Sequence, residues 1–207
     1  MYGSLSARAL DIPRARGQVK RDETDAEPEA LSRNVEIGMT YFAKTVPSPV
    51  GALKLVAGEK GLCAVLWEND DRKRVPLGEL IAGPEHPILV QAERELREYF
   101  AGERASFSVP LDPAGTAFQK KVWNALLTIP YGETRSYGDL ARQIGNPKAS
   151  RAVGAANGKN PLSIVTPCHR AIGADGALTG FAGGLAAKRY LLSLEAAARR
   201  GRGSMRG

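Results

Sequence analysis

The sequence is poor in cysteine and histidine, and this scarcity excludes several classes of protein. Two Cys and two His occur among 207 residues, too few for the disulfide framework of a small secreted domain. The four side chains, Cys63, His86, Cys168 and His169, show neither the C-x-x-C nor the H-x-x-x-H spacing of a zinc site. We therefore expect no metal and no other cofactor, and we expect a reducing, cytoplasmic location.

Long apolar runs are also lacking. No stretch approaches the ~20 apolar residues that a transmembrane helix needs, and the first ten residues lack the apolar stretch of a signal peptide, so no membrane partner is expected. The hydrophobic fraction of 43% and the charged fraction of 25% are ordinary for a soluble protein, which excludes wholesale disorder and fibrous repeats. The length allows one large domain or two small ones.

Charge is unevenly distributed along the chain. Residues 111–207 contain 14 Lys and Arg against 5 Asp and Glu, a net +9, whereas residues 1–110 contain 15 and 17, a net −2. Leaving out the four arginines that follow residue 198 still leaves +5 on residues 111–198. A basic half predicts a polyanionic partner, and nucleic acid is the commonest polyanion.

The first half divides into two parts. Residues 1–38 are polar and without periodicity, so we predict a flexible extension. Residues 39–110 predict a small α/β domain, in which Cys63 is a buried strand residue and His86 an exposed residue at the start of a helix. Its predicted elements are three strands and one helix, at residues 40–46, 52–57, 62–67 and 87–100. The apolar face of this helix consists of Ile88, Ala92, Leu96 and Tyr99.

The second half predicts helices. After a linker at residues 107–115, Thr116 and Gln119 form the capping-box pattern of a first helix. Ser136 caps a second helix, which a turn at Gly145-Asn146 joins to a third. Three further expectations are Asn146 as the cap of the third helix, Pro147 as its first residue, and a short strand over residues 162–165.

The third predicted helix has an apolar side that includes Ala152 and Val153. Another stripe of the helix is small and basic and consists of Lys148, Arg151, Ala155 and Gly158. Small side chains let a helix backbone approach a nucleic acid closely, and the two cations can meet phosphates. The stripe has no Asn or Gln pair for bidentate base reading, so we expect little sequence specificity.

Candidate chemistry lies in the segment Thr166-Pro167-Cys168-His169-Arg170. A thiolate is the reactive form of cysteine, and neighbouring cationic or proton-accepting groups lower the pKa of a thiol. The segment therefore predicts a nucleophilic cysteine, and a buried structural cysteine with incidental neighbours is the alternative.

These motifs resemble a known family. Pro167-Cys168-His169-Arg170, preceded by Asn160-Pro161 and followed by Gly180-Phe181-Ala182-Gly183-Gly184, is similar to the O6-alkylguanine-DNA alkyltransferases, and most similar to the stand-alone bacterial Ogt type. The resemblance extends from about Met39 to Glu195. It implies a ribonuclease-H-like α/β domain at residues 39–110, a winged helix-turn-helix domain at residues 114–195, and a basic tail at residues 196–207.

The resemblance also implies an activity. Such a protein binds duplex DNA in the minor groove, rotates an O6-alkylguanine out of the stack, and transfers the alkyl group irreversibly to one cysteine; O4-alkylthymine is a second expected substrate. Each molecule acts once and needs no cofactor. We expect a monomer, with self-association on DNA left open.

The resemblance assigns roles to individual residues. Cys168 is the alkyl acceptor, His169 a base acting through water, and Glu195 the residue that orients His169. Tyr137 crowds the phosphate and donates to the guanine leaving group, and Arg151 fills the gap in the duplex. The remaining assignments are DNA contacts at Lys148, Ser150 and Ala152, a structural link at Asn160 and Arg170, and a substrate pocket of Ala171, Phe181, Ala182 and Gly183.

Two positions depart from the family pattern. Phe181 stands where many relatives have tyrosine, so a hydroxyl is missing while a stacking surface remains. Ala182 stands where some relatives have serine. The last predicted helix bears Glu195 just off an apolar face that consists of Ala187, Tyr190, Leu191 and Leu194, where a carboxylate is either solvated or held by a partner such as His169.

Two other functions share some of these features. A winged-helix regulator without chemistry would have the basic half and the helix pair, but would leave Cys168, His169 and Glu195 unexplained. A Cys-His hydrolase would not need a basic helical half, and adjacent Cys168 and His169 make direct contact between the two side chains awkward.

Overall fold

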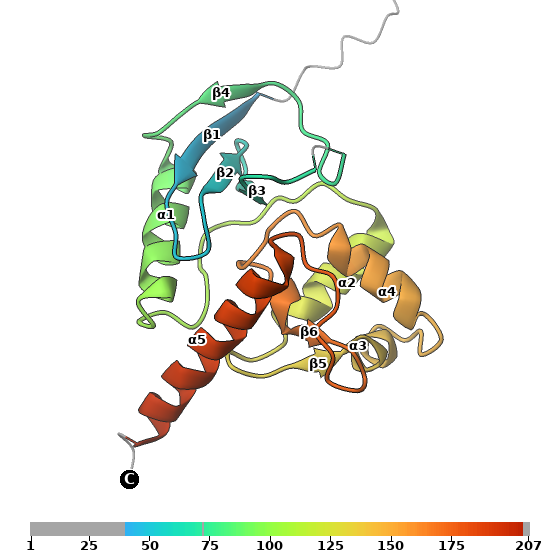
Figure 1. The fold of residues 1–207 in the computed structure, drawn as a ribbon. Helices are drawn as coiled ribbons and strands as arrows, with labels where there is room; N and C mark the ends of the chain where they lie inside the picture. The colour runs from blue at the N-terminus through green and yellow to red at the C-terminus, as the bar shows by residue number, and fades with distance from the viewer. Residues whose placement is uncertain (1–39, 72, 205–207) are drawn as a thin grey trace, which may run out of the picture. The chain divides into compact units, whose positions relative to one another are not determined.

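The computed structural model describes residues 40–71 and 73–204 (Figure 1). The predicted extension at residues 1–38 and the last three residues of the predicted tail lie outside the described residues. Four strands form one sheet in the order β3-β2-β1-β4. β1 (Tyr41–Val46), β2 (Leu53–Ala57) and β3 (Leu62–Trp67) form the expected antiparallel meander, and β4 (Leu80–Ala82) pairs in parallel with β1.

The sequence did not predict β4. It has three residues and lies between Gly78 and Gly83 in a segment that also contains prolines. A strand this short shows no alternation of apolar and polar residues. Its pairing with β1 depends on residues almost forty positions away, so the tertiary fold decides it.

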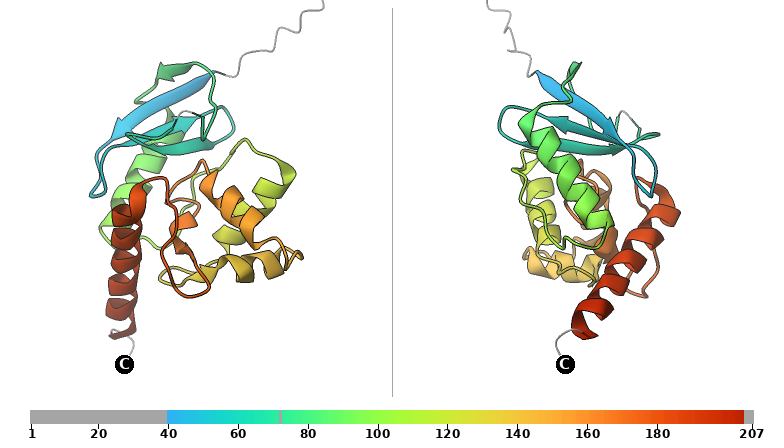
Figure 2. Two further views of the ribbon diagram at one scale, coloured as in Figure 1. Left: turned by 45° about the vertical axis from the view of Figure 1, so that its right-hand side comes forward. Right: turned by 90° about the vertical axis from the view of Figure 1, so that its left-hand side faces the viewer.

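Helix α1 (Pro87–Phe100) packs against one face of the sheet and completes the first hydrophobic core (Figure 2). Leu89, Ala92, Leu96 and Tyr99 are buried on this helix, as helical spacing requires. Cys63 is buried in β3, as predicted. The prediction of an exposed His86 is wrong, because its ring is half-buried and stacks on Phe42 at a centroid distance of 4.8 Å.

The predicted linker at residues 107–115 is a packed part of the first core. Val109 is buried, and Phe107 and Leu111 pack against the core. The carboxylate of Glu95, which is fully buried, accepts the backbone N–H groups of Ser108 at 2.8 Å and Val109 at 3.2 Å and the Ser108 hydroxyl at 2.5 Å. These bonds attach the connecting segment to α1.

The second half contains α2 (Ala117–Leu127), α3 (Tyr137–Gln143) and α4 (Ser150–Gly158), which surround a second hydrophobic core. The predicted capping box at Thr116 and Gln119 is present, and Ser136 caps α3. β5 (Arg135–Ser136) and β6 (Ala171–Ile172) pair in parallel, and α5 (Gly184–Ser204) ends the described chain. Figure 2 shows α2, α3 and α4 grouped together away from the sheet.

The predicted start of the third helix is wrong. Helix α4 begins at Ser150, and Lys148 lies in the preceding turn. The N–H groups of Gly145 and Asn146 donate to Arg142 and Ala141 at 2.9 Å each and so close the end of α3, which is a Schellman motif with glycine at φ +77°. The position before α4 is occupied by Ala149, which makes no side-chain capping bond, so Asn146 belongs to the turn that ends α3 and is not the cap of the next helix.

Residues 162–165 form a turn and not the predicted strand. Leu162 makes one isolated bridge to Val65, and the Thr166 N–H then donates back to the Leu162 carbonyl at 2.8 Å. Ile164 has φ +71°, an unfavourable conformation for a β-branched residue. The apolar composition of residues 162–165 reflects their burial in the first core. A buried turn and a buried strand can have the same apolar composition, so composition does not distinguish them.

We expect Glu95→Ala to lower the free energy of unfolding at pH 7 by about 2–4 kcal/mol, because buried N–H groups lose their acceptor. Burial alone would raise the pKa of Glu95, but hydrogen bonds from Ser108 and Gln91 lower it overall. A lowered carboxyl pKa stabilises the fold above the unfolded-state value of about 4.3 and ceases to do so as pH falls through the folded-state value. Urea denaturation at several pH values should therefore show the difference shrinking below about pH 4.

Glu93→Ala is the matched control on the same helix. Glu93 is partly exposed and pairs with Lys44 at 2.5 Å, so its loss should cost less than about 1 kcal/mol. Equal effects of the two substitutions would contradict the anchoring role of Glu95.

Candidate active site

The candidate nucleophile lies on a short buried turn. Cys168, His169 and Arg170 form a 3₁₀ helix that follows Pro167 and packs against α2 and α5. The exposed fractions of the three residues are 4%, 0% and 6%. Three consecutive chemically reactive or charged side chains are thus withdrawn from solvent, which requires partners for each of them.

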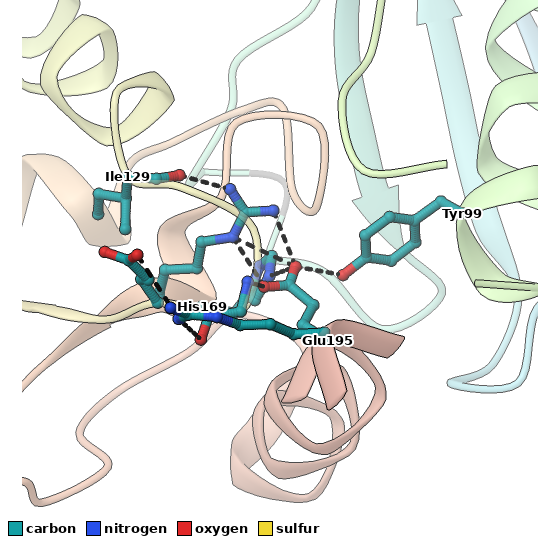
Figure 3. A network of polar contacts seen from close by, with 8 residues as sticks. Tyr99, Ile129, His169 and Glu195 are labelled. Carbon is teal, nitrogen blue, oxygen red and sulfur yellow. Dashed lines mark hydrogen bonds and ion pairs between the residues drawn. The ribbon is translucent and has the colours of Figure 1, made fainter. Parts of the chain in front are cut away.

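Glu195 of α5 supplies the central partner (Figure 3). Its Oε1 atom accepts hydrogen bonds from His169 Nε2 at 2.8 Å, Arg170 Nη2 at 2.9 Å and the Tyr99 hydroxyl at 2.7 Å. Its Oε2 atom accepts Arg170 Nε at 2.9 Å and the Gly132 N–H at 3.0 Å. Glu195 is therefore held by partners, one of the two environments expected for a carboxylate at the edge of this helix.

The electrostatics determine the state of His169. Burial alone would raise the pKa of Glu195, but hydrogen bonds from His169 and Arg170 lower it to about 2. The carboxylate is thus ionised and can only accept, so His169 Nε2 carries a proton. Burial lowers the pKa of His169, which keeps the ring neutral at pH 7. Nδ1 is buried and makes no hydrogen bond within the described part of the chain, so its lone pair is available to accept a proton.

The environment of the thiol differs from the sequence-based expectation. Burial raises the pKa of Cys168, and this effect outweighs the lowering by the Asn160 side chain, Arg74 and Lys188. The resting residue is therefore a thiol at neutral pH. The thiol therefore needs a base to accept its proton when it reacts, and the neutral imidazole of the adjacent His169 can serve as that base.

Asn160 links the end of α4 to the turn that precedes Cys168. Its Nδ2 atom donates to the Thr166 carbonyl at 2.9 Å, and its Oδ1 atom accepts the Leu162 N–H at 3.0 Å. Its own carbonyl accepts a hydrogen bond from Arg74, which also pairs with Asp70. These contacts hold the strained turn in place.

Arg170 supports the site from the other side. Its Nη1 atom donates to the Ile129 carbonyl at 2.7 Å, and its guanidinium lies over the Tyr131 ring at 5.6 Å. Together with the two Glu195 oxygens, these contacts fix the turn against the end of α2.

The predicted DNA-contacting residues lie on the exposed side of the helix pair. Ser150, Arg151 and Ala152 are exposed on α4, and Lys148 is exposed in the turn before it. The sequence had also placed Ala152 on the apolar side of this helix, which is wrong. Tyr137 is half-buried at the start of α3, and its hydroxyl accepts a hydrogen bond from the Thr179 hydroxyl at 3.1 Å.

The predicted pocket residues occupy different environments. Ala171 is fully buried in the second core, and Ala182 is exposed. Phe181 is half-buried, with ring centroids 5.4 Å from Trp67 and 6.5 Å from His169. A Cβ atom at Gly183 would lie 2.5 Å from the Trp67 ring, so this approach requires glycine.

Two residues of the site were missed by the sequence. Tyr99 was assigned to the apolar face of its helix, and no local pattern distinguishes a packing tyrosine from one that donates to a distant carboxylate. Lys188 is fully buried, and its Nζ atom donates to the carbonyls of Ala171 at 2.7 Å and Thr179 at 3.0 Å. Its helical spacing with Leu191 and Glu195 is a signal that could have revealed it. Tyr190, expected on that apolar face, is 39% exposed.

Residues 40–71 and 73–204 contain neither a candidate metal site nor a candidate transmembrane helix. No group of three or more His, Cys, Asp or Glu side chains in these residues could hold a metal ion. None of the helices in the same residues is long and apolar enough to cross a membrane.

Comparison with known proteins identifies the family. The ribonuclease-like domain of 6-O-methylguanine DNA methyltransferase matches residues 41–113, and the DNA binding domain of that protein matches residues 117–197. The fold and its two domains are thus those of a cysteine-dependent DNA methyltransferase. The chain belongs to the family of methylated-DNA–protein-cysteine methyltransferases.

The regions that align with this chain span nearly the full lengths of the relatives named here. A methylated-DNA–protein-cysteine methyltransferase of Methanosarcina acetivorans is 52% identical over 75% of this chain and 97% of that protein. The constitutive methylated-DNA–protein-cysteine methyltransferase of Bacillus subtilis is 47% identical over 76% of this chain and 96% of that protein. The crystal structure of Mycobacterium tuberculosis OGT in complex with DNA superposes with a TM-score of 0.70 at 46% identity, covering 76% of this chain and 94% of that one.

We expect Asn160→Ala to raise the pKa of Cys168 further, since the Asn160 hydrogen bond lowers it. The pH at which iodoacetamide modifies Cys168 at half its maximal rate should move upward, as followed by mass spectrometry of the peptide that contains Cys168. Asn146→Ala, at an exposed turn, should leave this pH unchanged. A downward shift for Asn160→Ala would contradict the assigned interaction.

Proposed function

We propose that this protein repairs DNA by direct reversal, transferring the alkyl group from O6 of guanine in duplex DNA to Sγ of Cys168. O4-alkylthymine is a second substrate of the same chemistry. The observation that carries the proposal is the buried arrangement of Cys168, His169 and Glu195, together with the exposed cations Arg151 on α4 and Lys148 in the turn before it, in a chain of the methylated-DNA–protein-cysteine methyltransferase family.

The reaction balances on the residues of this chain. The Cys168 thiol proton passes to His169 Nδ1 through water, and the sulfur attacks the alkyl carbon. The carbon–O6 bond breaks as the carbon–sulfur bond forms, and the departing guanine takes up a proton with Tyr137 as donor. Glu195 holds His169 in the tautomer that leaves Nδ1 free to accept. The thioether product is stable, so each molecule reacts once.

Positioning of the alkyl carbon against the sulfur has to supply most of the rate acceleration of alkyl transfer. A free thiol with a pKa of about 8.5 is only a few per cent ionised at pH 7. Lowering the pKa would increase the thiolate fraction but weaken the nucleophile by a comparable factor. A well-aligned bound geometry can contribute about 7–11 kcal/mol, against a few kcal/mol for extruding the base.

The exposed surface of α4 is the proposed DNA contact. Arg151 enters the duplex and fills the space of the extruded guanine, and Lys148 in the preceding turn meets phosphate, with Ser150 and Ala152 close to the groove. Small exposed side chains permit a close approach of the helix to the minor groove with little sequence specificity. Ala171, Phe181, Ala182 and Gly183 surround the extruded base. We further propose that the protein acts as a monomer in the cytoplasm.

Cys168→Ala should abolish alkyl transfer while leaving DNA affinity within about twofold, because the buried sulfur contributes no contact to the duplex surface. Incubation with duplex DNA that carries a radiolabelled O6-methylguanine should label the unaltered protein once, at Cys168. Cys63→Ala is the control, because it removes the other buried thiol, and this variant should still take up one labelled methyl group per protein molecule.

Other results would contradict the proposal. Binding without any label would indicate the regulator, and repeated turnover would indicate a hydrolase. Label on Cys63 would place the reaction at the wrong sulfur.

Tyr137→Phe should slow alkyl transfer by about tenfold to a hundredfold under single-turnover conditions with saturating DNA, because loss of a positioned proton donor commonly costs such factors. Tyr190→Phe, an exposed tyrosine of α5, is the control. A change in DNA affinity alone, with an unchanged rate at saturation, would remove Tyr137 from the proton-donor role.

A further inference from the structure

Tyr99 belongs to the first hydrophobic core, yet its hydroxyl reaches the carboxylate of the active site (Figure 3). The ring is 0% exposed and packs against the rings of Phe100, Phe107 and Tyr131. The hydroxyl lies 2.7 Å from Glu195 Oε1, which is the same oxygen that binds His169 Nε2 at 2.8 Å.

The direction of this hydrogen bond is determined. Glu195 is ionised and can only accept, so Tyr99 donates. Burial and the Glu195 carboxylate raise the pKa of Tyr99, which keeps its proton in place at every working pH. Hydrogen bonds to a charged oxygen are strong and withdraw charge from it. Tyr99 therefore reduces the negative charge that Oε1 presents to His169.

We propose that Tyr99 is a positioning residue for alkyl transfer, whose hydroxyl binds Glu195 Oε1 and thereby limits the basicity of His169, so that the imidazole stays neutral and ready to accept the thiol proton. The inference rests on the proposed function of Cys168. It also assigns the ribonuclease-like domain a part in the chemistry, because α1 of that domain supplies the hydroxyl.

The charged and titratable groups around His169 determine the expected effect. Glu195 of α5 favours the imidazolium, whereas burial, Arg170 of the same 3₁₀ helix and Lys188 of α5 disfavour it. Cys168 precedes His169 in the chain and is a neutral thiol at rest. Removing the Tyr99 hydroxyl strengthens the Glu195 contribution and leaves the others in place. The pKa of His169 should therefore rise in Tyr99→Phe.

The chain offers a direct measurement, because His86 and His169 are its only histidines. In protein labelled with ¹⁵N-histidine and free of DNA, the imidazole nitrogens report the tautomer and the titration of each ring. Tyr99→Phe keeps the buried ring and should move the His169 midpoint upward by about half to one pH unit. His86, which stacks on Phe42, is the internal reference and should not shift.

Tyr131→Phe is the matched control, since it removes a hydroxyl from the same aromatic cluster and keeps the ring beneath Arg170. It should leave the His169 midpoint unchanged. The proton on His169 Nε2 should remain visible and slowly exchanging in both variants, which distinguishes a change of charge from a loosening of the site.

Single-turnover transfer from an O6-methylguanine duplex provides the second measurement. In Tyr99→Phe the acid limb of the pH–rate profile should move upward with the His169 midpoint, while the alkaline plateau stays within about twofold, because a pKa change affects only the protonated fraction. A purely structural role would lower the plateau at every pH.

Two results would overturn the inference. One is an equal titration midpoint of His169 in Tyr99→Phe and in the unaltered protein, or the absence of any His169 titration in both. The other is loss of the Nε2 proton signal together with a lowered plateau. Failure of the proposed function would be distinct: the unaltered protein would transfer no alkyl group, while the titration without DNA would still test Tyr99.

Discussion

The ionised carboxylate of Glu195 is the interaction on which the site and the packing around it both depend. A buried carboxylate is stable only when its oxygens are fully engaged. Here the donors come from α1, from the turn after α2 and from the 3₁₀ helix that carries the nucleophile. The same contacts therefore join the two hydrophobic cores and orient the candidate base. Residues of both cores thus act on one carboxylate.

Burial of the nucleophile and exposure of the helix pair are complementary. Cys168 is 4% exposed, whereas Ser150, Arg151 and Ala152 of α4 face solvent. A base within a stacked duplex cannot reach a sulfur at that depth, so extrusion of the base is a geometric requirement of the proposed reaction. Asn160 follows α4 and holds the turn before Cys168, which connects the exposed surface of α4 to the site through one short segment.

The parts of the structure that local sequence controls were predicted well. The capping box at Thr116, the cap at Ser136 and the spacing of α1 depend on residues within a few positions of one another. One failure arose where a distant contact decides, and two arose where short-range hydrogen bonds close a turn. Pairing with β1 creates β4, the turn that closes α3 includes Asn146 while α4 begins only at Ser150, and hydrogen bonds between Asn160 and Leu162 and Thr166 hold residues 162–165 in a turn.

The sequence by itself determined the basic half of the chain and the candidate nucleophile with its neighbouring histidine and arginine, because adjacency, composition and a resemblance to known motifs are properties of the order of residues. Only the tertiary structure decided the protonation states. The ionised Glu195, the neutral His169 and the resting thiol of Cys168 depend on burial and on partners up to 96 positions apart in the chain. Desolvation and hydrogen bonding across a folded core set these states, and neither exists until the chain has folded.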